Sequence, residues 1–253
     1  MKVTAALAWW DESVEDLVRC VRGMSNIADR VVAFDGSYRR YPHATVASPP
    51  EQAEAIRKTA DEAGMESLIY VPDRLWAGQV EKRAMLLRAA AEKSDWVVVA
   101  DADHVITADR GMARAHLASM PAHVDIVGTR FVTVPAPPSA TIGPASNWHR
   151  ASVANLGTIF RALPGLTCKQ RHYTYFASKN GGQPVGLIYG NFANDHVLAT
   201  YEVQHLCLAR DARHVLENRA YINDRETIIR LTGQEDDQPG LPEPVWDFET
   251  VPL

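Results

Sequence analysis

Short apolar runs alternate with stretches of helical periodicity in the first part of this chain, and this alternation constrains the fold more than any other feature. The apolar runs are Val3 to Ala8, Arg30 to Phe34, Ser67 to Val71 and Trp96 to Ala100. Between the first two runs, Val14, Leu17, Val18 and Val21 have the i, i+3, i+4, i+7 spacing of an amphipathic helix. Strands that alternate with helices in this way build a parallel sheet with covering helices. We therefore expect an α/β fold.

Local signals predict where the intervening helices begin and end. Ser13 is followed three residues later by Asp16, which is typical of a helix N-terminus. In the segment from Ser48 to Glu51, Ser48 is expected to cap a helix, with a proline at its first position and an acidic residue in its first turn. A third helix is expected from about Gln79 to Glu92.

The fourth apolar run ends in two carboxylates, Asp101 and Asp103. Ligands of open α/β sheets bind just outside the carboxyl ends of the strands. If the backbone stays extended, residues i and i+2 point the same way, so both carboxylates can reach one ion. Carboxylates this close repel each other unless a cation lies between them, and Mg²⁺ or Mn²⁺ held by few carboxylates completes its shell with water and substrate phosphates. The pair predicts a metal-assisted nucleotide site, with a simple strand-ending turn as the alternative.

The second half of the chain has a less regular pattern. It is expected to contain a short helix, several short strands, a Pro- and Gly-rich loop and a long last helix. These are Gly111 to Ser119 (helix), Ile126 to Val134, Thr158 to Phe160, Tyr173 to Phe176, Val185 to Tyr189 and Tyr201 to Leu208 (strands), Pro135 to Asn147 (loop) and Ala209 to Leu231 (helix).

Composition excludes several classes of protein. The 253 residues carry a net charge of -5 with Lys and Arg scattered along the chain, which argues against a basic nucleic-acid-binding surface. The three cysteines have no metal-like spacing and leave an odd thiol, so a disulfide framework is not expected. No run approaches the ~18 consecutive apolar residues of a membrane span, and the N-terminus lacks the pattern of a signal peptide. We therefore expect a soluble cytoplasmic protein.

The α/β half, the Asp101-Ala102-Asp103 motif and the irregular second half together resemble a GT-A glycosyltransferase of the family 2 group. The resemblance is strongest over Val3 to Val105 and Thr200 to Arg213. It implies a Rossmann-like half with a mostly parallel sheet over residues 1–107, which binds a nucleotide sugar, and an irregular β-containing acceptor half of the same domain over residues 108–233. Residues 234–253 would form an acidic, Pro-rich tail.

The activity implied by this resemblance is hexosyltransferase-type transfer, with Mn²⁺ or Mg²⁺, from a nucleoside-diphosphate sugar to an acceptor. The acceptor would be a glycan, a protein or a small molecule. The resemblance fixes neither the donor sugar nor the stereochemistry.

The resemblance also assigns residues to the donor site. Phe34-Asp35-Gly36-Ser37 is similar to a family motif with two aspartates, one of them lost here. An acidic residue of that motif accepts the N3–H of uracil, so Asp35 would take this role and UDP is preferred over GDP. An ordinary Asp-Gly turn is the alternative reading.

The segment from Gly78 to Ala84 resembles the family segment with a basic residue just before the Asp-x-Asp strand. Lys82 or Arg83 is expected there to meet phosphate oxygens or to orient the carboxylates. We favour Arg83, because a solvated helix face is the competing explanation for Lys82. Gly78 and Trp10, which follows the first apolar run, complete the expected donor site.

A late histidine is a further metal ligand in several GT-A relatives, mostly retaining ones. Val203 to Arg210 resembles that strand and has His205 in the ligand position. A neutral imidazole suits Mn²⁺, although a histidine between apolar residues is also a common core residue.

Catalysis by an inverting enzyme requires a general base at the acceptor hydroxyl. Asp195 is our candidate, with His172 and His149 as alternatives. The segment from Phe160 to His172 resembles a family segment that ends in His-Glu, but Tyr173 stands here in place of the glutamate.

Three other classes of function remain as alternatives. A nucleotidyltransferase can share this half-fold and its acidic pair, but it usually has a Gly- and basic-rich loop after the first strand, where this chain has Trp9 to Ser13. A phosphatase with an aspartate nucleophile places its carboxylates after the first strand rather than the fourth. A non-catalytic module that binds a sugar nucleotide would keep the fold without turnover.

Overall fold

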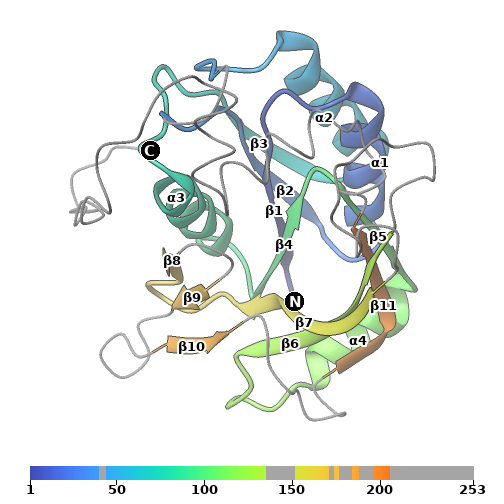
Figure 1. Cartoon of the computed structure of the whole chain (residues 1–253). Helices are drawn as coiled ribbons and strands as arrows, with labels where there is room; N and C mark the ends of the chain where they lie inside the picture. The colour runs from blue at the N-terminus through green and yellow to red at the C-terminus, as the bar shows by residue number, and fades with distance from the viewer. Residues whose placement is uncertain (40–43, 135–151, 171–173, 177–183, 188–196, 206–253) are drawn as a thin grey trace.

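The computed structural model describes residues 1–39, 44–134, 152–170, 174–176, 184–187 and 197–205 (Figure 1). Its main sheet has eight strands in the order β3-β2-β1-β4-β7-β6-β11-β5. The strands are β1 (Val3–Ala8), β2 (Arg30–Phe34), β3 (Glu66–Tyr70), β4 (Trp96–Asp101), β5 (His104–Ala108), β6 (Ile126–Thr133), β7 (Ser152–Arg161) and β11 (Val197–His205). A second sheet has the order β10-β9-β8, formed by β8 (Thr167–Gln170), β9 (Thr174–Phe176) and β10 (Pro184–Leu187).

Most neighbouring strands of the main sheet are parallel. β3, β2, β1 and β4 form one parallel block, and β11 is parallel to β6. β7 runs antiparallel to both β4 and β6, and β5 runs antiparallel to β11. The fold is therefore a mixed α/β fold with a mostly parallel sheet, compatible with a Rossmann-like nucleotide-binding fold, as the sequence predicted.

Four helices are described: α1 (Val14–Met24), α2 (Pro50–Glu62), α3 (Gln79–Ala91) and α4 (Arg110–Ser119). In Figure 1, α1 and α2 lie on one side of the parallel block and α3 lies on the other. The two cores confirm this arrangement, because α1, α2 and α4 share one cluster of buried side chains and α3 shares the second with Leu166 and Cys168.

The central strands are apolar throughout because both of their faces are covered. In β1, Val3, Ala5 and Leu7 belong to the core under α1, while Ala6 belongs to the core under α3. Successive side chains of a strand point to opposite faces, so a strand between two helical layers must be apolar at every position. The continuous apolar runs of the sequence follow from this burial.

One helix start agrees with the sequence prediction and another does not. Ser13 caps α1, and its hydroxyl accepts a hydrogen bond from the amide of Asp16 at 3.0 Å. The prediction that Ser48 caps α2 is wrong, because Pro49 occupies that position. The Ser48 hydroxyl is instead 2.5 Å from a carboxylate oxygen of Asp35, a charged acceptor that binds a donor more strongly than a backbone group does.

Several other boundaries differ from the predicted ones. β3 begins and ends one residue earlier than predicted, and β11 begins at Val197 rather than Tyr201. β5 and β8 were not predicted at all. The predicted loop at 135–147, the helix at 209–231 and the tail at 234–253 lie outside the described residues. The division into residues 1–107 and 108–233 stays a prediction.

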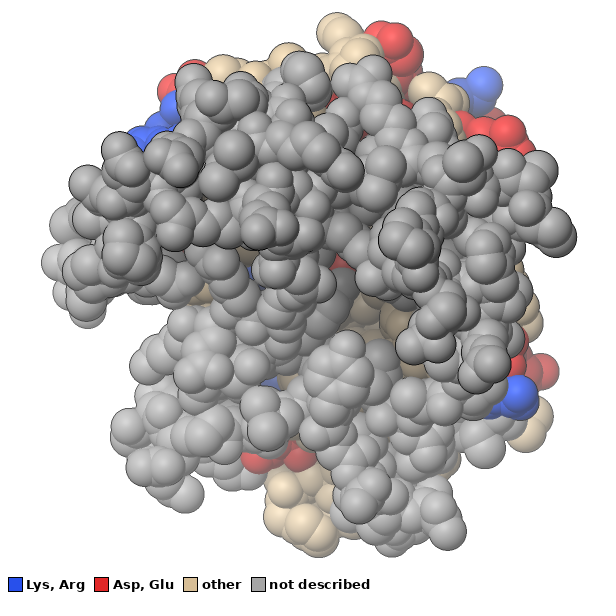
Figure 2. All heavy atoms as spheres, viewed as in Figure 1, with Lys and Arg blue, Asp and Glu red and all other residues tan. Residues whose placement is uncertain are grey.

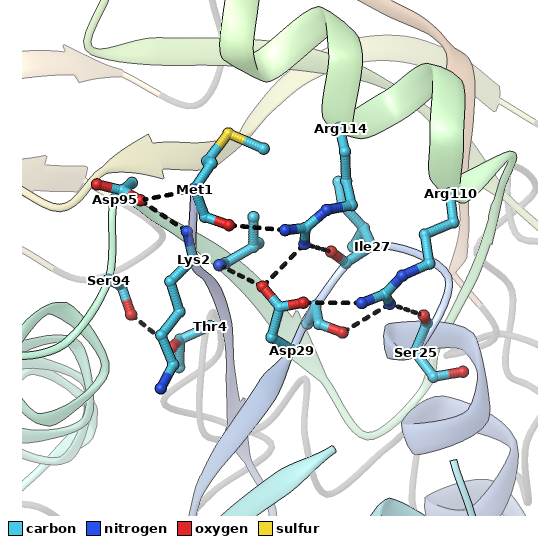
Figure 3. A network of polar contacts seen from close by, with 12 residues as sticks. Met1, Lys2, Thr4, Ser25, Ile27, Asp29, Ser94, Asp95, Arg110 and Arg114 are labelled. Atoms are coloured by element: carbon cyan, nitrogen blue, oxygen red, sulfur yellow. Dashed lines mark hydrogen bonds and ion pairs between the residues drawn. The ribbon is translucent and has the colours of Figure 1, made fainter. Parts of the chain in front are cut away.

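A polar network ties α4 to the amino ends of β1 and β2 (Figure 3). The Asp29 carboxylate accepts hydrogen bonds from Arg110 and Arg114 at 2.8 Å each and from the amide of Val3 at 3.0 Å. Partial burial opposes ionisation of Asp29, but the bonds from Val3 and Arg114 outweigh it and lower its pKa below 3.8. This network lies at the amino edge of the sheet, opposite the strand ends where ligands of α/β proteins bind.

The surface carries both signs of charge where α1 and α2 lie. Figure 2 shows acidic and basic side chains of described residues next to one another along that margin. Exposed pairs such as Arg57 with Glu54 and Lys58 with Glu62 belong to α2. Pairs this exposed contribute little to stability.

Among the described residues, we find no helix with the length and apolar character that crossing a bilayer requires.

Candidate functional site

The strands β1, β2 and β4 end level with one another. Ala8 pairs with Phe34 on one side and with Asp101 on the other, so the residues that follow these strands leave the sheet at the same edge. We call this the carboxyl edge and define it by the residues that follow β1, β2 and β4. The first turn of α3 packs against it, as the contacts of Lys82 and Arg83 show.

Lys82 is buried at the carboxyl edge. Its ammonium group donates to the carbonyl oxygens of Trp9 at 2.7 Å and Gly36 at 2.8 Å, and lies 5.7 Å from the ring centre of Tyr38. Burial lowers the pKa of Lys82 from 10.5 to about 7, with the charge of Arg83 adding to this effect and that of Asp35 opposing it. The interpretation of Lys82 as part of a solvated helix face is therefore wrong.

Only glycine fits at position 36, whose carbonyl oxygen accepts the hydrogen bond from Lys82. Gly36 has φ +96°, a left-handed conformation that favours glycine. A Cβ atom there would lie 2.5 Å from a ring carbon of Pro72 and 2.7 Å from the Val46 carbonyl oxygen. The Asp35-Gly36 turn is thus fixed by packing as well as by hydrogen bonds.

Arg83 forms an ion pair with Asp101. One guanidinium nitrogen, Nη2, lies 2.8 Å from each carboxylate oxygen of Asp101. The Arg83 side chain is 6% exposed and the Asp101 side chain 20%. Binding of phosphate by Arg83 stays a prediction.

The chain reverses immediately after β4. Ala102 and Asp103 form a turn between β4, which ends at Asp101, and β5, which begins at His104. The ring nitrogen Nδ1 of His104 accepts a hydrogen bond from the Asp101 amide at 3.1 Å. The assumption of an extended backbone from Asp101 to Asp103 is therefore wrong, because β5 must run back to pair with β11.

Asp103 is buried within this turn. One of its carboxylate oxygens lies 3.9 Å from Nε2 of His104, whose ring packs edge-on against Phe131 with 5.2 Å between ring centres. This contact is longer than a hydrogen bond, and it places the imidazole of His104 beside the Asp103 carboxylate.

β11 brings the backbone of His205 to the same turn. His205 pairs with His104 across β5 and β11, so its backbone lies beside the residue that follows Asp103. The side chain of His205 lies outside the description, and its role as a metal ligand stays a prediction.

Asp35 is a hub of hydrogen bonds in the interior. Its carboxylate accepts from the Gly36 amide at 2.6 Å, from the Ser48 amide at 2.8 Å and from the Ser48 hydroxyl at 2.5 Å. A carboxylate has about four acceptor positions, so these bonds use most of them. The assignment of Asp35 to uracil binding stays a prediction.

Ser48 also connects Asp35 to the loop after β1. Its hydroxyl oxygen accepts from the amide of Asp11 at 2.9 Å, and the next amide, of Glu12, donates to a side-chain oxygen of Gln52 at 3.2 Å. Trp10, between these groups and β1, donates from its indole nitrogen to the Thr45 hydroxyl at 2.8 Å. The loop after β1 is therefore tied to the segment that leads into α2.

Of the remaining predicted residues, one lies at the start of α3 and the others lie outside the described part of the chain. Gly78 is the N-cap of α3 and has an extended backbone. Asp195, His172 and His149 lie outside the described residues.

The carboxyl edge offers oxygen ligands to a cation. No group of three or more His, Cys, Asp or Glu side chains that would hold a metal ion gathers within the described part of the chain. Asp101 and Asp103 are hard oxygen donors, a set that fits Mg²⁺ or Mn²⁺ bound jointly with substrate phosphates. The donor chemistry thus fits the predicted ion, while further ligands would come from substrate, water or His205.

The sequence analysis considered Lys82 but favoured Arg83 over it, and it gave no role to His104. Glu81, Lys82 and Arg83 are consecutive, and successive helix residues are about 100° apart, so three of them span about 200°. They cannot all face solvent on a helix that covers a sheet, and all three are in fact buried. This run of charges was a signal that the helix start carries a polar site. For His104, the only sequence signal of a place in the site was its position directly after Asp103.

Comparisons with known proteins gave only weak structural likenesses. No family model matches the chain, and no curated protein matches it. Among solved structures it is similar to mannose-1-phosphate geranyltransferase from Thermus thermophilus, with 17% identity and a TM-score of 0.27 over 65% of this chain and 51% of that one. The chain therefore spans about half the length of that structure, and a likeness with so low a TM-score does not bear on fold or function.

Proposed function

We propose that this protein is a metal-dependent glycosyltransferase of the GT-A type. It binds a nucleoside-diphosphate sugar at the carboxyl edge and transfers the sugar, a hexose, to a glycan, protein or small-molecule acceptor. The observation that carries the proposal is the convergence of Lys82, Arg83, Asp101 and Asp103 on this edge of a parallel block of strands. Ligands of α/β sheets bind in this position.

The donor diphosphate carries several negative charges, and the site supplies matching groups. Asp101 and Asp103, with His205, would hold Mn²⁺ or Mg²⁺, which when bound stabilises the charge that grows on the leaving nucleoside diphosphate. Arg83 would donate to phosphate oxygens, since a guanidinium matches the geometry of such oxygens. Gly78 and Trp10 would complete the contacts to the donor.

Recognition of the base and activation of the acceptor involve other residues. Asp35 would accept the N3–H of uracil with its remaining acceptor position, which favours UDP over GDP. Asp195, or else His172 or His149, would take the proton of the acceptor hydroxyl if the reaction inverts the anomeric centre.

The loop after β1 disfavours a nucleotidyltransferase. Such enzymes bind phosphates with the free amides of a Gly- and basic-rich loop, whereas the amides of Asp11 and Glu12 here already donate to Ser48 and Gln52. Nucleotidyl transfer stays the alternative that the experiment must separate from sugar transfer.

Calorimetry with UDP and GDP, each with and without Mn²⁺, tests the binding part of the proposal. UDP should bind with Mn²⁺, and Asp101→Asn and Asp103→Asn should weaken this binding sharply. Asp61→Asn, on the exposed surface of α2, is the control that should bind like the wild type. UDP affinity that is the same with and without Mn²⁺ would contradict the metal assignment.

Product analysis tests the reaction. Incubation with a panel of UDP- and GDP-sugars should release the nucleoside diphosphate. Release of pyrophosphate from a nucleoside triphosphate and a sugar phosphate would favour a nucleotidyltransferase instead. Tight binding without release of either product would indicate a non-catalytic module.

A further inference from the structure

Arg83 binds the Asp101 carboxylate, which the proposed metal site also needs. Its Nη2 atom lies 2.8 Å from both oxygens of Asp101, so the guanidinium faces the open side of the carboxylate between its two oxygens. A cation that binds both oxygens must approach from the same side. Arg83 and a divalent ion therefore cannot both hold this face of Asp101.

The ion pair is shielded from water on the arginine side. Arg83 is 6% exposed, whereas Asp101, which pairs with Ala8 at the end of β1, is 20% exposed. Loss of either partner would leave the other charge at least partly buried and without its counter-ion. Arg83 thus provides the positive charge that compensates a partly buried Asp101.

Lys82, the preceding residue, is near Asp101 but is bound elsewhere. Its ammonium group donates to the carbonyls of Trp9 and Gly36, and its charge interacts with Asp101 only from a distance. Both neighbouring cations contribute positive charge to the carboxyl edge. Of the two, Arg83 contacts the Asp101 carboxylate, whereas Lys82 does not.

We propose that Arg83 and the divalent cation compete for Asp101, so that metal binding and release of the Arg83 guanidinium toward the substrate diphosphate occur as one coupled step. This inference rests on the proposed function. A guanidinium released from Asp101 needs a new anion, and a diphosphate at the same edge provides it. The competition makes Arg83 a residue that couples metal and donor binding.

Thermodynamic linkage gives the expected consequences. A competitor inside the site lowers metal affinity, and a diphosphate that binds the displaced Arg83 restores it. UDP should therefore raise Mn²⁺ affinity in the wild type, and Mn²⁺ should raise UDP affinity by the same factor. Without the guanidinium, Mn²⁺ alone should bind more tightly, and UDP should raise the Mn²⁺ affinity by a smaller factor than in the wild type.

The experiment measures Mn²⁺ affinity without nucleotide, by calorimetry and by electron paramagnetic resonance of free Mn²⁺. Arg83→Met should bind Mn²⁺ about tenfold more tightly than the wild type or better, within the usual range of coupling between sites. Lys82→Met, titrated below pH 7 where Lys82 is charged, is the matched control, because it removes one positive charge from the same edge without freeing Asp101. Its Mn²⁺ affinity should rise much less.

A second variant keeps the test decisive if Arg83→Met folds poorly. Arg83→Lys retains the positive charge but has a different reach and geometry, so its Mn²⁺ affinity should lie between those of the wild type and Arg83→Met. Circular dichroism and thermal melting establish that each variant is folded before titration.

Three results would overturn the inference. The first is equal or weaker Mn²⁺ affinity in folded Arg83→Met and Arg83→Lys, and the second is an equal gain in Arg83→Met and Lys82→Met. Either would leave the metal-dependent function standing, because the wild type would still bind Mn²⁺ with UDP. The third is absence of Mn²⁺ binding in every variant with and without UDP, which would refute the metal-dependent function as well.

Discussion

Replacing Lys82 by Met removes a buried charge and leaves a side chain of similar length in its place. The pKa of Lys82 is about 7 in the folded protein, against an ordinary value of 10.5. A difference of this size corresponds to about 5 kcal/mol of unfavourable free energy for the charged form in the folded state. Lys82→Met abolishes this cost but leaves the carbonyls of Trp9 and Gly36 without their donor, which costs about 1–3 kcal/mol each.

The two effects are of similar size in acid, and they separate as pH rises. Between the folded pKa of about 7 and the ordinary 10.5, the unfolded chain binds more protons at Lys82 than the folded protein does. The cost of burial is therefore fully present below pH 7 and is relieved as the pH rises toward 10.5. From pH 6 to pH 9, the free energy of unfolding of the wild type should rise by about 2–3 kcal/mol relative to Lys82→Met.

Urea denaturation at pH 6, 7, 8 and 9 measures this difference. Lys58→Met is the matched control, because Lys58 is 73% exposed on α2 and its contact with Glu62 is a surface pair. The control should follow the wild type at every pH. Parallel curves for the wild type and Lys82→Met between pH 6 and pH 9 would refute the reasoning, because they would mean that Lys82 titrates alike in the folded and unfolded states.

Three further substitutions test other parts of the molecule. Asp103→Ala should abolish transfer while leaving the melting temperature without metal unchanged, since the proposed role of Asp103 is to bind the cation; a large drop in that melting temperature would indicate a structural role. Asp35→Asn should lower the free energy of unfolding by about 2–4 kcal/mol in urea titrations, because its NH₂ group would face the amide and hydroxyl donors of Ser48 and Gly36; a loss no larger than that of the exposed Asp61→Asn would contradict this. Asp29, whose pKa is lowered below 3.8 by hydrogen bonds that outweigh its partial burial, should stabilise the protein relative to Asp29→Asn above about pH 4 and lose this advantage as pH falls through the folded pKa. An advantage undiminished at about pH 2 would disprove that account of acid stability.

Local sequence patterns were sufficient for the alternating half of the fold. β1 and β2 and the Ser13 cap of α1 match their predictions, because apolar periodicity and capping depend on residues close together in the chain. The same patterns placed Asp101 at the end of β4, and the rule that parallel strands end at one edge placed it beside β1 and β2. The class of fold and the edge that carries the candidate site follow from this information.

The geometry of the site was decided by contacts between distant parts of the chain. Lys82 is buried because its carbonyl acceptors on Trp9 and Gly36 lie 73 and 46 positions away. The Asp101–Asp103 turn reverses because β5 pairs with β11, nearly a hundred residues further along. Each of these side chains has an ordinary local alternative, a solvated lysine or an extended aspartate pair, that the sequence also permits. Only the assembled sheet selects between them, because burial and strand pairing are properties of the neighbours that the fold supplies.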